Sequence, residues 1–238
     1  MSTLILVPGL MCDAAVWAHQ VHALGGTAQV TVPDHGLADS IGAMAARILE
    51  RAPDRFALAG HSMGGRVALE IVRRAPARVA ALALLDTHYR GLPEGEAGRL
   101  ETEGRRALVE LAHRAGMRAV GERWLKIPMV HPSRLADATL TGEILAMIER
   151  RTPEQFEAQV RALITRPDAA SVLGAIRCHT LVLCGAQDAW ARPEGHREMA
   201  ALIPGSTLVS IPVCGHMAPL ERPAEVSEAL AAWLREGK

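Results

Sequence analysis

The chain has 238 residues, of which 49% are hydrophobic, and its 26 lysines and arginines balance its 26 aspartates and glutamates. Without a net field to attract a polyanion, this balance argues against nucleic acid or an anionic membrane surface as a partner. The longest apolar run, residues 79–85, is far shorter than the roughly 20 residues that cross a bilayer, and no basic segment precedes the apolar N-terminus. We therefore expect a cytoplasmic protein with no membrane partner.

Short apolar runs rich in β-branched residues alternate with amphipathic stretches along the chain. Alternation of this kind predicts a parallel sheet with helices on both faces, the α/β class of fold. The predicted strands span residues 3–7, 29–32, 56–59, 79–85, 180–184 and 207–211. The predicted helices span residues 41–51, 63–74, 194–202 and 224–235.

Residues 91–175 break this rhythm, since they are charged, helical in pattern and without a convincing strand. Prolines predict a division of this segment into several short helices. They are Pro128, Pro132, Pro153 and Pro167. We expect residues 91–175 to form a helical cap inserted into a core made of residues 1–90 and 176–238. Such a cap would cover the carboxyl edge of the sheet, where open α/β folds bind ligands.

A Gly-x-Ser-x-Gly turn joins a predicted strand to a predicted helix at residues 56–65, Phe-Ala-Leu-Ala-Gly-His-Ser-Met-Gly-Gly. This context is that of a nucleophile elbow, in which a strained turn raises the serine to the edge of the sheet. Gly60 and Gly64 are small enough for strand and helix to approach each other. The pattern predicts that Ser62 is a nucleophile.

A nucleophilic serine needs a base, and the base needs an acid to orient it. Asp188 follows the fifth predicted strand and His216 follows the sixth, so both would reach the same sheet edge as Ser62. The chain order Ser62, Asp188, His216 is the order expected for this type of turn. Asp86 also ends a strand and is the alternative acid. Four other histidines are interpreted as hydrogen-bonded fillers near the pocket: His35, His61, His88 and His131.

Acyl transfer also requires donors for the developing oxyanion. The backbone N–H of Met63 is one candidate, because it starts the helix after the turn. The other is the Leu10 amide, since Gly9 lets the loop after the first strand turn toward the sheet edge.

With these residues assembled, the chain resembles the α/β-hydrolase superfamily along nearly its whole length. The resemblance rests on five segments, Pro-Gly-Leu-Met-Cys-Asp, Val-Pro-Asp-His-Gly, Gly-His-Ser-Met-Gly-Gly, Cys-Gly-Ala-Gln-Asp and Cys-Gly-His-Met. It implies an α/β-hydrolase fold and a Ser62, Asp188 and His216 triad that needs no cofactor. Family members usually carry His-Gly where this chain has Pro8-Gly9, but the donor there is a backbone amide.

Two further departures from the superfamily are informative. The first strand begins at Thr3 without the antiparallel hairpin that often precedes it, which implies about six strands, all parallel. Related cyanohydrin lyases carry a lysine just beyond the histidine, where this chain has Met217 and Ala218. A lysine-dependent lyase is therefore not expected.

Large apolar side chains are predicted to line a pocket that admits an apolar acyl or alkyl group. These candidates are Met11, Trp17, Met63, Trp124, Met129, Met147, Trp190 and Met217. No basic cluster predicts a phosphate or coenzyme A site. The most prominent arginines are assigned to solvated helix faces, namely Arg66, Arg105, Arg106, Arg150 and Arg151.

The four cysteines lack Cys-x-x-Cys spacing, so no metal site is predicted and the thiols are expected to be reduced and mostly buried. Together these features predict a serine hydrolase that cleaves a small to medium carboxylic ester through an acyl-enzyme. Alternatives with the same triad are a C–C bond hydrolase or thioesterase, a cofactor-free haloperoxidase or perhydrolase, and a ligand receptor derived from a hydrolase. The identity of the ester, and the choice between monomer and homodimer, stay open.

Overall fold

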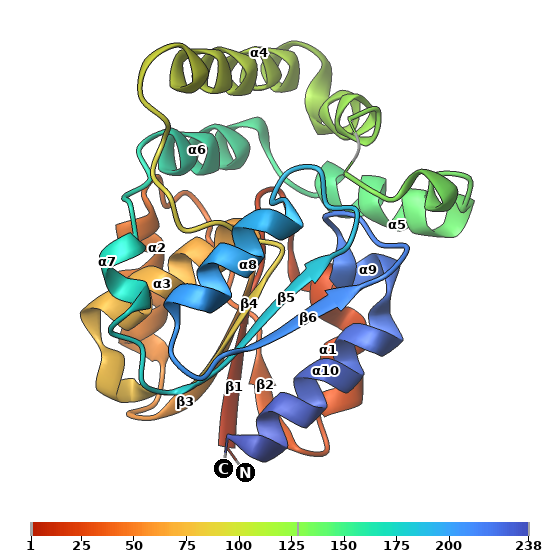
Figure 1. Ribbon diagram of the computed structural model, residues 1–238. Helices are drawn as coiled ribbons and strands as arrows, with labels where there is room; N and C mark the ends of the chain where they lie inside the picture. Colours follow the sequence, from red (N-terminus) through yellow and green to blue (C-terminus); the bar gives the residue numbers. More distant parts are fainter. Residues whose placement is uncertain (1, 128, 238) are drawn as a thin grey trace.

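Six parallel strands form the sheet in the computed structural model, which describes residues 2–127 and 129–237. They pair in the order β2-β1-β3-β4-β5-β6 (Figure 1). The prediction of about six strands, all parallel, is confirmed. The strands are β1 (Ser2–Val7), β2 (Ala28–Thr31), β3 (Phe56–His61), β4 (Val79–Leu85), β5 (His179–Gly185) and β6 (Thr207–Ile211).

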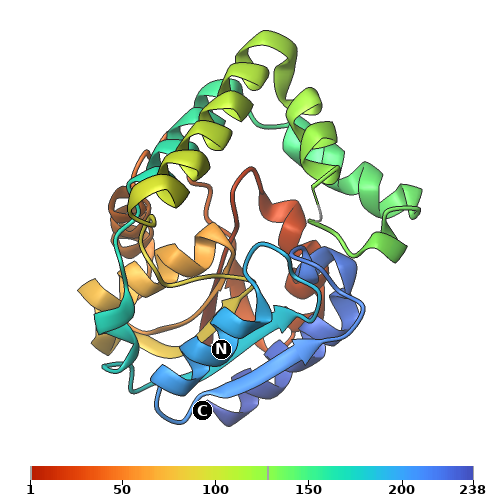
Figure 2. The same ribbon diagram turned by 45° about the horizontal axis from the view of Figure 1, so that its top comes forward.

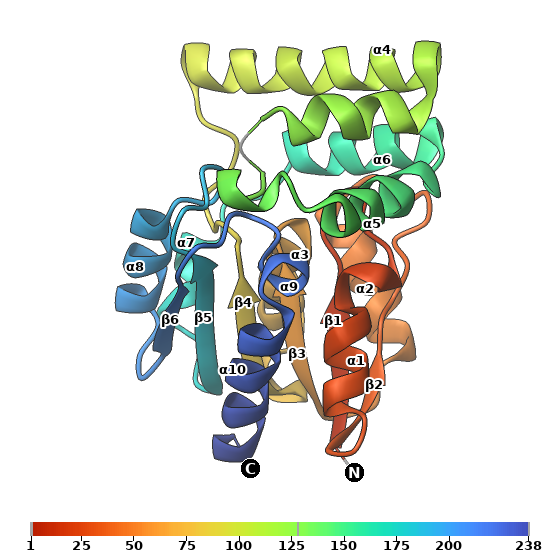
Figure 3. The ribbon, with the colours of Figure 1, turned by 90° about the vertical axis from the view of Figure 1, so that its right-hand side faces the viewer.

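Helices cover both faces of the sheet, because alternate residues of each strand point to opposite sides. Leu4 and Leu6 of β1 belong to one apolar core with α1 and α10, whereas Ile5 and Val7 belong to a second core with α2, α3 and α8. Figure 3 shows α1 and α10 on one side of the strands. These helices are α1 (Ala18–Leu24), α2 (Ile41–Arg51), α3 (Met63–Arg74), α8 (Pro193–Leu202) and α10 (Pro223–Glu236).

The chain between β4 and β5 forms a group of helices across the carboxyl ends of the strands (Figures 1 and 2). We call α4, α5 and α6 the helical insertion. Its apolar residues, among them Trp124 and Phe156, join the same core as Leu4 and Leu6. The elements are α4 (Gly95–Leu125), α5 (Ala138–Glu149), α6 (Pro153–Ile164) and the short α7 (Ala170–Leu173). The remaining elements are α9 (Ala218–Glu221) and the 3₁₀ turns Ala14–Trp17, Pro76–Arg78 and Pro132–Arg134.

The helical insertion differs from the prediction of several short helices. α4 runs for 31 residues, and its one break is at Gly116, where φ is 82°. Glycine adopts this conformation without steric cost, so the break is a kink rather than a proline boundary. Pro132 and Pro153 do begin helical turns, while Pro128 lies outside the described residues. Among the described helices, none is both long and apolar enough to cross a membrane.

Candidate active site

Ser62 occupies a sharp turn between β3 and α3, with φ of 55° and ψ of −118°. The turn depends on two glycines, because a Cβ on Gly60 would lie 2.3 Å from the Gly64 carbonyl oxygen, and a Cβ on Gly64 would lie 2.2 Å from that of Val7. The Ser62 amide donates a hydrogen bond to the Leu85 carbonyl at 2.9 Å. The backbone therefore holds Ser62 in a strained conformation at the carboxyl edge of the sheet.

Three side chains from separate loops meet at this edge. His216 Nε2 lies 2.8 Å from Ser62 Oγ, and His216 Nδ1 lies 2.8 Å from Asp188 Oδ2. Asp188 and His216 are 2% and 4% exposed, so solvent screens their attraction poorly. The other carboxylate oxygen of Asp188 accepts hydrogen bonds from the Trp190 and Ala191 amides.

These contacts decide which nitrogen of His216 carries its proton. Burial raises the pKa of Asp188, but attraction to His216 and the hydrogen bonds that it accepts outweigh this and lower the pKa below its ordinary value. An ionised carboxylate only accepts hydrogen bonds, so Nδ1–H must donate to Asp188. Nε2 of the neutral imidazole is then free to accept the Ser62 hydroxyl proton.

Asp86, the alternative acid, accepts hydrogen bonds from backbone amides and, within the described part of the chain, none from His216. Its oxygens accept from the Gly185 amide at 2.9 Å and the Ala218 amide at 3.2 Å, and Oδ2 lies 3.6 Å from His61 Nε2. Burial, followed by repulsion from Asp188, raises the pKa of Asp86 well above its ordinary value. Asp86 thus links the end of β5 to the loop that follows His216, and it makes no hydrogen bond to the His216 ring among the described residues.

The four other histidines occupy separate environments. His61 donates to the His216 carbonyl at 2.8 Å, and its burial, with repulsion from His216, lowers its pKa to about 3. His35 is buried against the Pro8 carbonyl. His88 lines the cavity described below, and burial lowers its pKa to about 4. His131 is half-buried, and its amide donates to Glu221.

The backbone amides of Leu10 and Met63 are the predicted oxyanion donors. Neither amide donates to an acceptor among the described residues. The neighbouring Met11 amide is already used, because it donates to Oε1 of Gln159 at 2.8 Å. Gln159 belongs to α6, so the helical insertion holds the loop after β1 beside Ser62.

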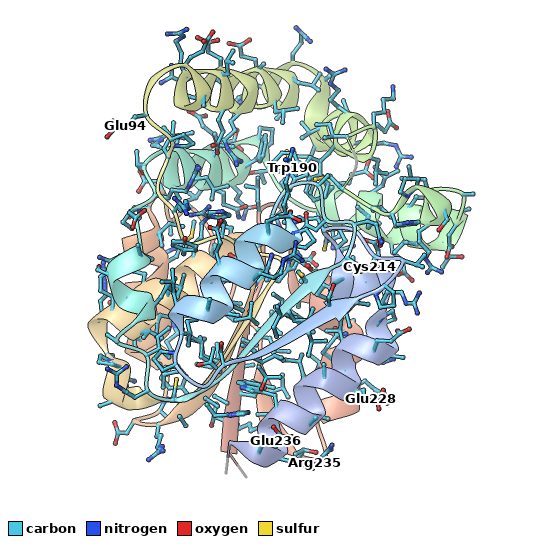
Figure 4. The ribbon with its side chains drawn as sticks, viewed as in Figure 1. Glu94, Trp190, Cys214, Glu228, Arg235 and Glu236 are labelled. Atoms are coloured by element: carbon cyan, nitrogen blue, oxygen red, sulfur yellow. The ribbon has the colours of Figure 1, made fainter. Side chains whose placement is uncertain are left out.

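Ser62 lines a first cavity of about 530 Å³, which lies between the sheet edge and the helical insertion. Of the predicted pocket residues, Met63, Trp124, Met129 and Trp190 line it, together with Leu10. Figure 4 shows Trp190 at the junction of the insertion and the sheet. A second cavity of about 460 Å³ lies against α4 and α6, and the residues that it shares with the first are Leu10, Glu101, Arg105, Trp124 and Trp190. Most of its walls are apolar, with Met11, Leu108, Leu111, Phe156 and Val160 among them.

Three other predicted pocket residues line neither cavity. Trp17, Met147 and Met217 are 0%, 1% and 0% exposed and belong to the apolar core. Sequence cannot separate these residues from pocket residues, because both kinds are large, apolar and placed at helical or strand-end positions.

The assignment of Arg66 and Arg105 to solvated helix faces is wrong. Both line the first cavity, as does Arg166, whereas Arg106 is exposed. Arg150 and Arg151 pair with Asp13, and only the Arg151 side chain is buried. A signal for Arg66 was present in the sequence. It lies in the first turn of the helix that begins just after Ser62, so it stays close to the same edge of the sheet.

Among the described residues, no group of three or more histidine, cysteine, aspartate or glutamate side chains is arranged to hold a metal ion. All four cysteines are free thiols, and three of them are buried: Cys12, Cys184 and Cys214.

Residues 4–229 match the family described as the alpha/beta hydrolase family. The chain is 30% identical over 220 residues to 2-succinyl-6-hydroxy-2,4-cyclohexadiene-1-carboxylate synthase of Salmonella paratyphi B, covering 89% of this chain and 80% of that protein. It is also 28% identical over 179 residues to the dihydrolipoyllysine-residue acetyltransferase component of an acetoin cleaving system from Pseudomonas putida. That match covers 75% of this chain and spans only 45% of the longer protein.

Among solved structures, a thermophilic esterase from Thermogutta terrifontis, with malate bound, superposes with a TM-score of 0.89. It is 31% identical, and the match covers 100% of this chain and 90% of the esterase. Family match, topology and the turn at Ser62 agree, and the chain belongs to the alpha/beta hydrolase family.

Proposed function

We propose that the protein is a serine hydrolase that cleaves a small to medium carboxylic ester through an acyl-enzyme. The observation that carries this proposal is the chain of two 2.8 Å hydrogen bonds from Asp188 through His216 to Ser62, at the floor of the first cavity. Likeness to an esterase that is 31% identical supports an ester as the substrate.

Acylation begins when Ser62 Oγ attacks the ester carbonyl carbon while His216 Nε2 takes the hydroxyl proton. The Leu10 and Met63 amides donate hydrogen bonds to the oxyanion, and the Asp188 carboxylate stabilises the imidazolium. The carbon–oxygen bond to the alcohol then breaks, and His216 returns its proton to the departing oxygen. An acyl group remains on Ser62, and a neutral alcohol leaves.

Deacylation repeats these steps with water as the nucleophile. His216 takes a proton from the water, which attacks the acyl carbon, and the proton is then passed to Ser62 Oγ as the acyl bond breaks. The products are a carboxylic acid and the free enzyme. The second cavity suits an apolar part of the substrate, because apolar side chains form most of its walls.

A p-nitrophenyl ester series from acetate to decanoate tests this proposal and measures the length of the apolar group that the enzyme accepts. We expect Ser62→Ala to lower kcat by about 10⁶-fold, since the triad acts as a unit. A fluorophosphonate probe should label the wild type and the control Ser171→Ala, whose serine is exposed on α7, but not Ser62→Ala. Full activity in Ser62→Ala, or labelling at another residue, would contradict the proposal.

A further inference from the structure

Three arginines from distant parts of the chain line the first cavity beside Ser62. Arg66 lies on α3, Arg105 on α4, and Arg166 just after α6. Arginine side chains are strongly hydrated, so their convergence in a half-enclosed cavity requires a compensating interaction.

Glu101 of α4 compensates only part of this charge. Its carboxylate accepts from both terminal nitrogens of Arg166, at 2.6 and 2.9 Å, and from Arg105 Nε at 2.9 Å. Burial raises the pKa of Glu101, but these partners outweigh burial and lower it to about 2, so the carboxylate is fully ionised at neutral pH. One carboxylate thus neutralises one of the three guanidinium groups.

Arg66 is the arginine of the three that makes no hydrogen bond to Glu101 in the part of the chain that the structure describes. Its hydrogen bond within the described residues joins Nη1 to the Arg90 carbonyl, a neutral acceptor, at 2.7 Å. Asp168, an exposed carboxylate whose charge also acts on Arg66, accepts hydrogen bonds from the Gly91 and Ala170 amides. Burial, followed by repulsion from Arg166 and Arg105, lowers the pKa of Arg66 to about 9. The side chain is still a cation at neutral pH, and its surroundings oppose the charge.

A second observation concerns the balance of charge at the same place. The Arg166 side chain is only 6% exposed, yet its Nε has no hydrogen-bond partner among the described residues. Other acidic groups near the cavity do not supply one, because Asp86 accepts from backbone amides and Asp188 accepts from His216. Arg90 at the rim is exposed and pairs with Glu198 at 3.0 Å.

Resting on the proposed function, we propose that the substrate is an ester whose acyl group carries a second, ionised carboxylate, which binds Arg66 and offsets the positive charge of Arg66, Arg105 and Arg166. The planar guanidinium of Arg66 can hold a carboxylate through two parallel hydrogen bonds. Arg66 and Ser62 line the same cavity, so the second carboxylate and the scissile carbonyl can belong to one short acyl chain. The substrates that this proposal names are short half-esters, those of dicarboxylic acids of four to six carbons.

Monoethyl glutarate and ethyl pentanoate provide a matched pair of substrates, because they differ by a carboxylate in place of a methyl group. We expect the wild type to prefer monoethyl glutarate by about 10- to 100-fold in kcat/KM. Arg66→Gln should remove this preference by lowering kcat/KM for monoethyl glutarate far more than kcat/KM for ethyl pentanoate, and Arg66→Lys should keep part of the preference. The control Arg106→Gln, which removes an exposed arginine of α4, should behave as the wild type.

Binding provides a readout that does not need turnover. Glutarate should bind Ser62→Ala measurably by calorimetry, and the added change Arg66→Gln should weaken it by about 10- to 100-fold, whereas pentanoate should bind weakly to both. If Arg66→Gln does not fold, inhibition of the wild-type enzyme still tests the carboxylate site. Glutarate should inhibit ethyl pentanoate hydrolysis, and 1,5-pentanediol should not.

The outcomes separate this inference from the proposed function. Equal kcat/KM for the two esters, with both reactions lost in Ser62→Ala, would overturn the carboxylate site and leave the ester hydrolase in place. Binding of glutarate that depends on Arg66, without hydrolysis of any ester, would support the carboxylate site and overturn the proposed reaction.

Discussion

The buried carboxylate of Glu221 holds the backbone on both sides of His216. Its oxygens accept from the Gly215 amide at 3.0 Å and the Met217 amide at 3.1 Å, and a third hydrogen bond comes from the His131 amide at 2.8 Å. Glu221 is 1% exposed, so no water replaces these bonds if the carboxylate is removed. Glu221 therefore positions the imidazole against Ser62 without touching the substrate.

We expect Glu221→Gln to lower kcat by about 100-fold, because it puts an NH₂ group where amide donors converge and misplaces the His216 ring. KM for a neutral ester should change less than threefold, since Glu221 lines neither cavity. Titration of active sites with a fluorophosphonate corrects kcat for unfolded protein. The control Glu228→Gln, at an exposed position on α10, should leave kcat and KM unchanged (Figure 4). Normal kcat per titrated site would show that Glu221 acts on stability alone.

Gln159 makes the corresponding contact on the oxyanion side. In Gln159→Leu the buried Met11 amide loses its acceptor, which costs about 1–3 kcal/mol of unfolding free energy. The loop that carries the Leu10 amide should also shift, so we expect weaker inhibition by an alkylboronic acid, a mimic of the tetrahedral intermediate, and about tenfold lower kcat. Gln29→Leu, at an exposed position on β2, is the control. Unchanged boronate affinity together with reduced stability would restrict Gln159 to a structural role.

Asp188 and Asp86 should respond very differently to the same substitution. Asp188→Asn removes the acceptor that fixes the His216 tautomer, and we expect kcat to fall by as much as roughly 10⁴-fold. Asp86 makes no hydrogen bond to the His216 ring among the described residues, so asparagine there disturbs the Gly185 or Ala218 amide but leaves the His216 tautomer in place. Asp86→Asn should therefore lower kcat by less than about tenfold. Initial rates with one p-nitrophenyl ester compare the two variants, and the opposite ranking would assign the acid role to Asp86.

Features that depend on neighbouring residues were predictable from the sequence. The Ser62 turn needs Gly60 and Gly64, each of which lies two residues from Ser62, so a short sequence pattern is enough to recognise the turn. The loops of Asp188 and His216 each follow a strand, and parallel strands bring their carboxyl ends to one edge. A parallel sheet with helices on both faces follows from the same alternation.

Features that depend on the docking of the helical insertion were not predictable. Arg105 and Arg166 lie 61 residues apart and meet at Glu101 only because α4 and α6 pack side by side over the sheet. An amphipathic pattern indicates that a helix has a polar face, but it does not tell whether solvent or a cavity lies opposite. Trp17 and Trp190 illustrate the same limit, since one is fully buried and the other lines both cavities.

The charge on Arg66 predicts how the preference for an anionic ester depends on pH. kcat/KM reports ionisations of the free enzyme, in which the pKa of Arg66 is lowered to about 9 by burial and then by repulsion from Arg166 and Arg105. Below this pH Arg66 is a cation and attracts the second carboxylate, which is ionised throughout because carboxyl pKa values lie near 4. Above it, Arg66 is neutral and the attraction is lost.

The ratio of kcat/KM for monoethyl glutarate to that for ethyl pentanoate should therefore be constant from pH 7 to 8 and fall as pH rises through about 9. Ionisations of the triad affect both esters alike and cancel in the ratio. At fixed ionic strength, and after subtraction of spontaneous hydrolysis, the ratio in Arg66→Gln should be near one and independent of pH. The prediction attributes the fall in the ratio to loss of the positive charge of Arg66. A wild-type ratio that stays constant to pH 10.5, or an equal fall in Arg66→Gln, would show that another group controls the preference.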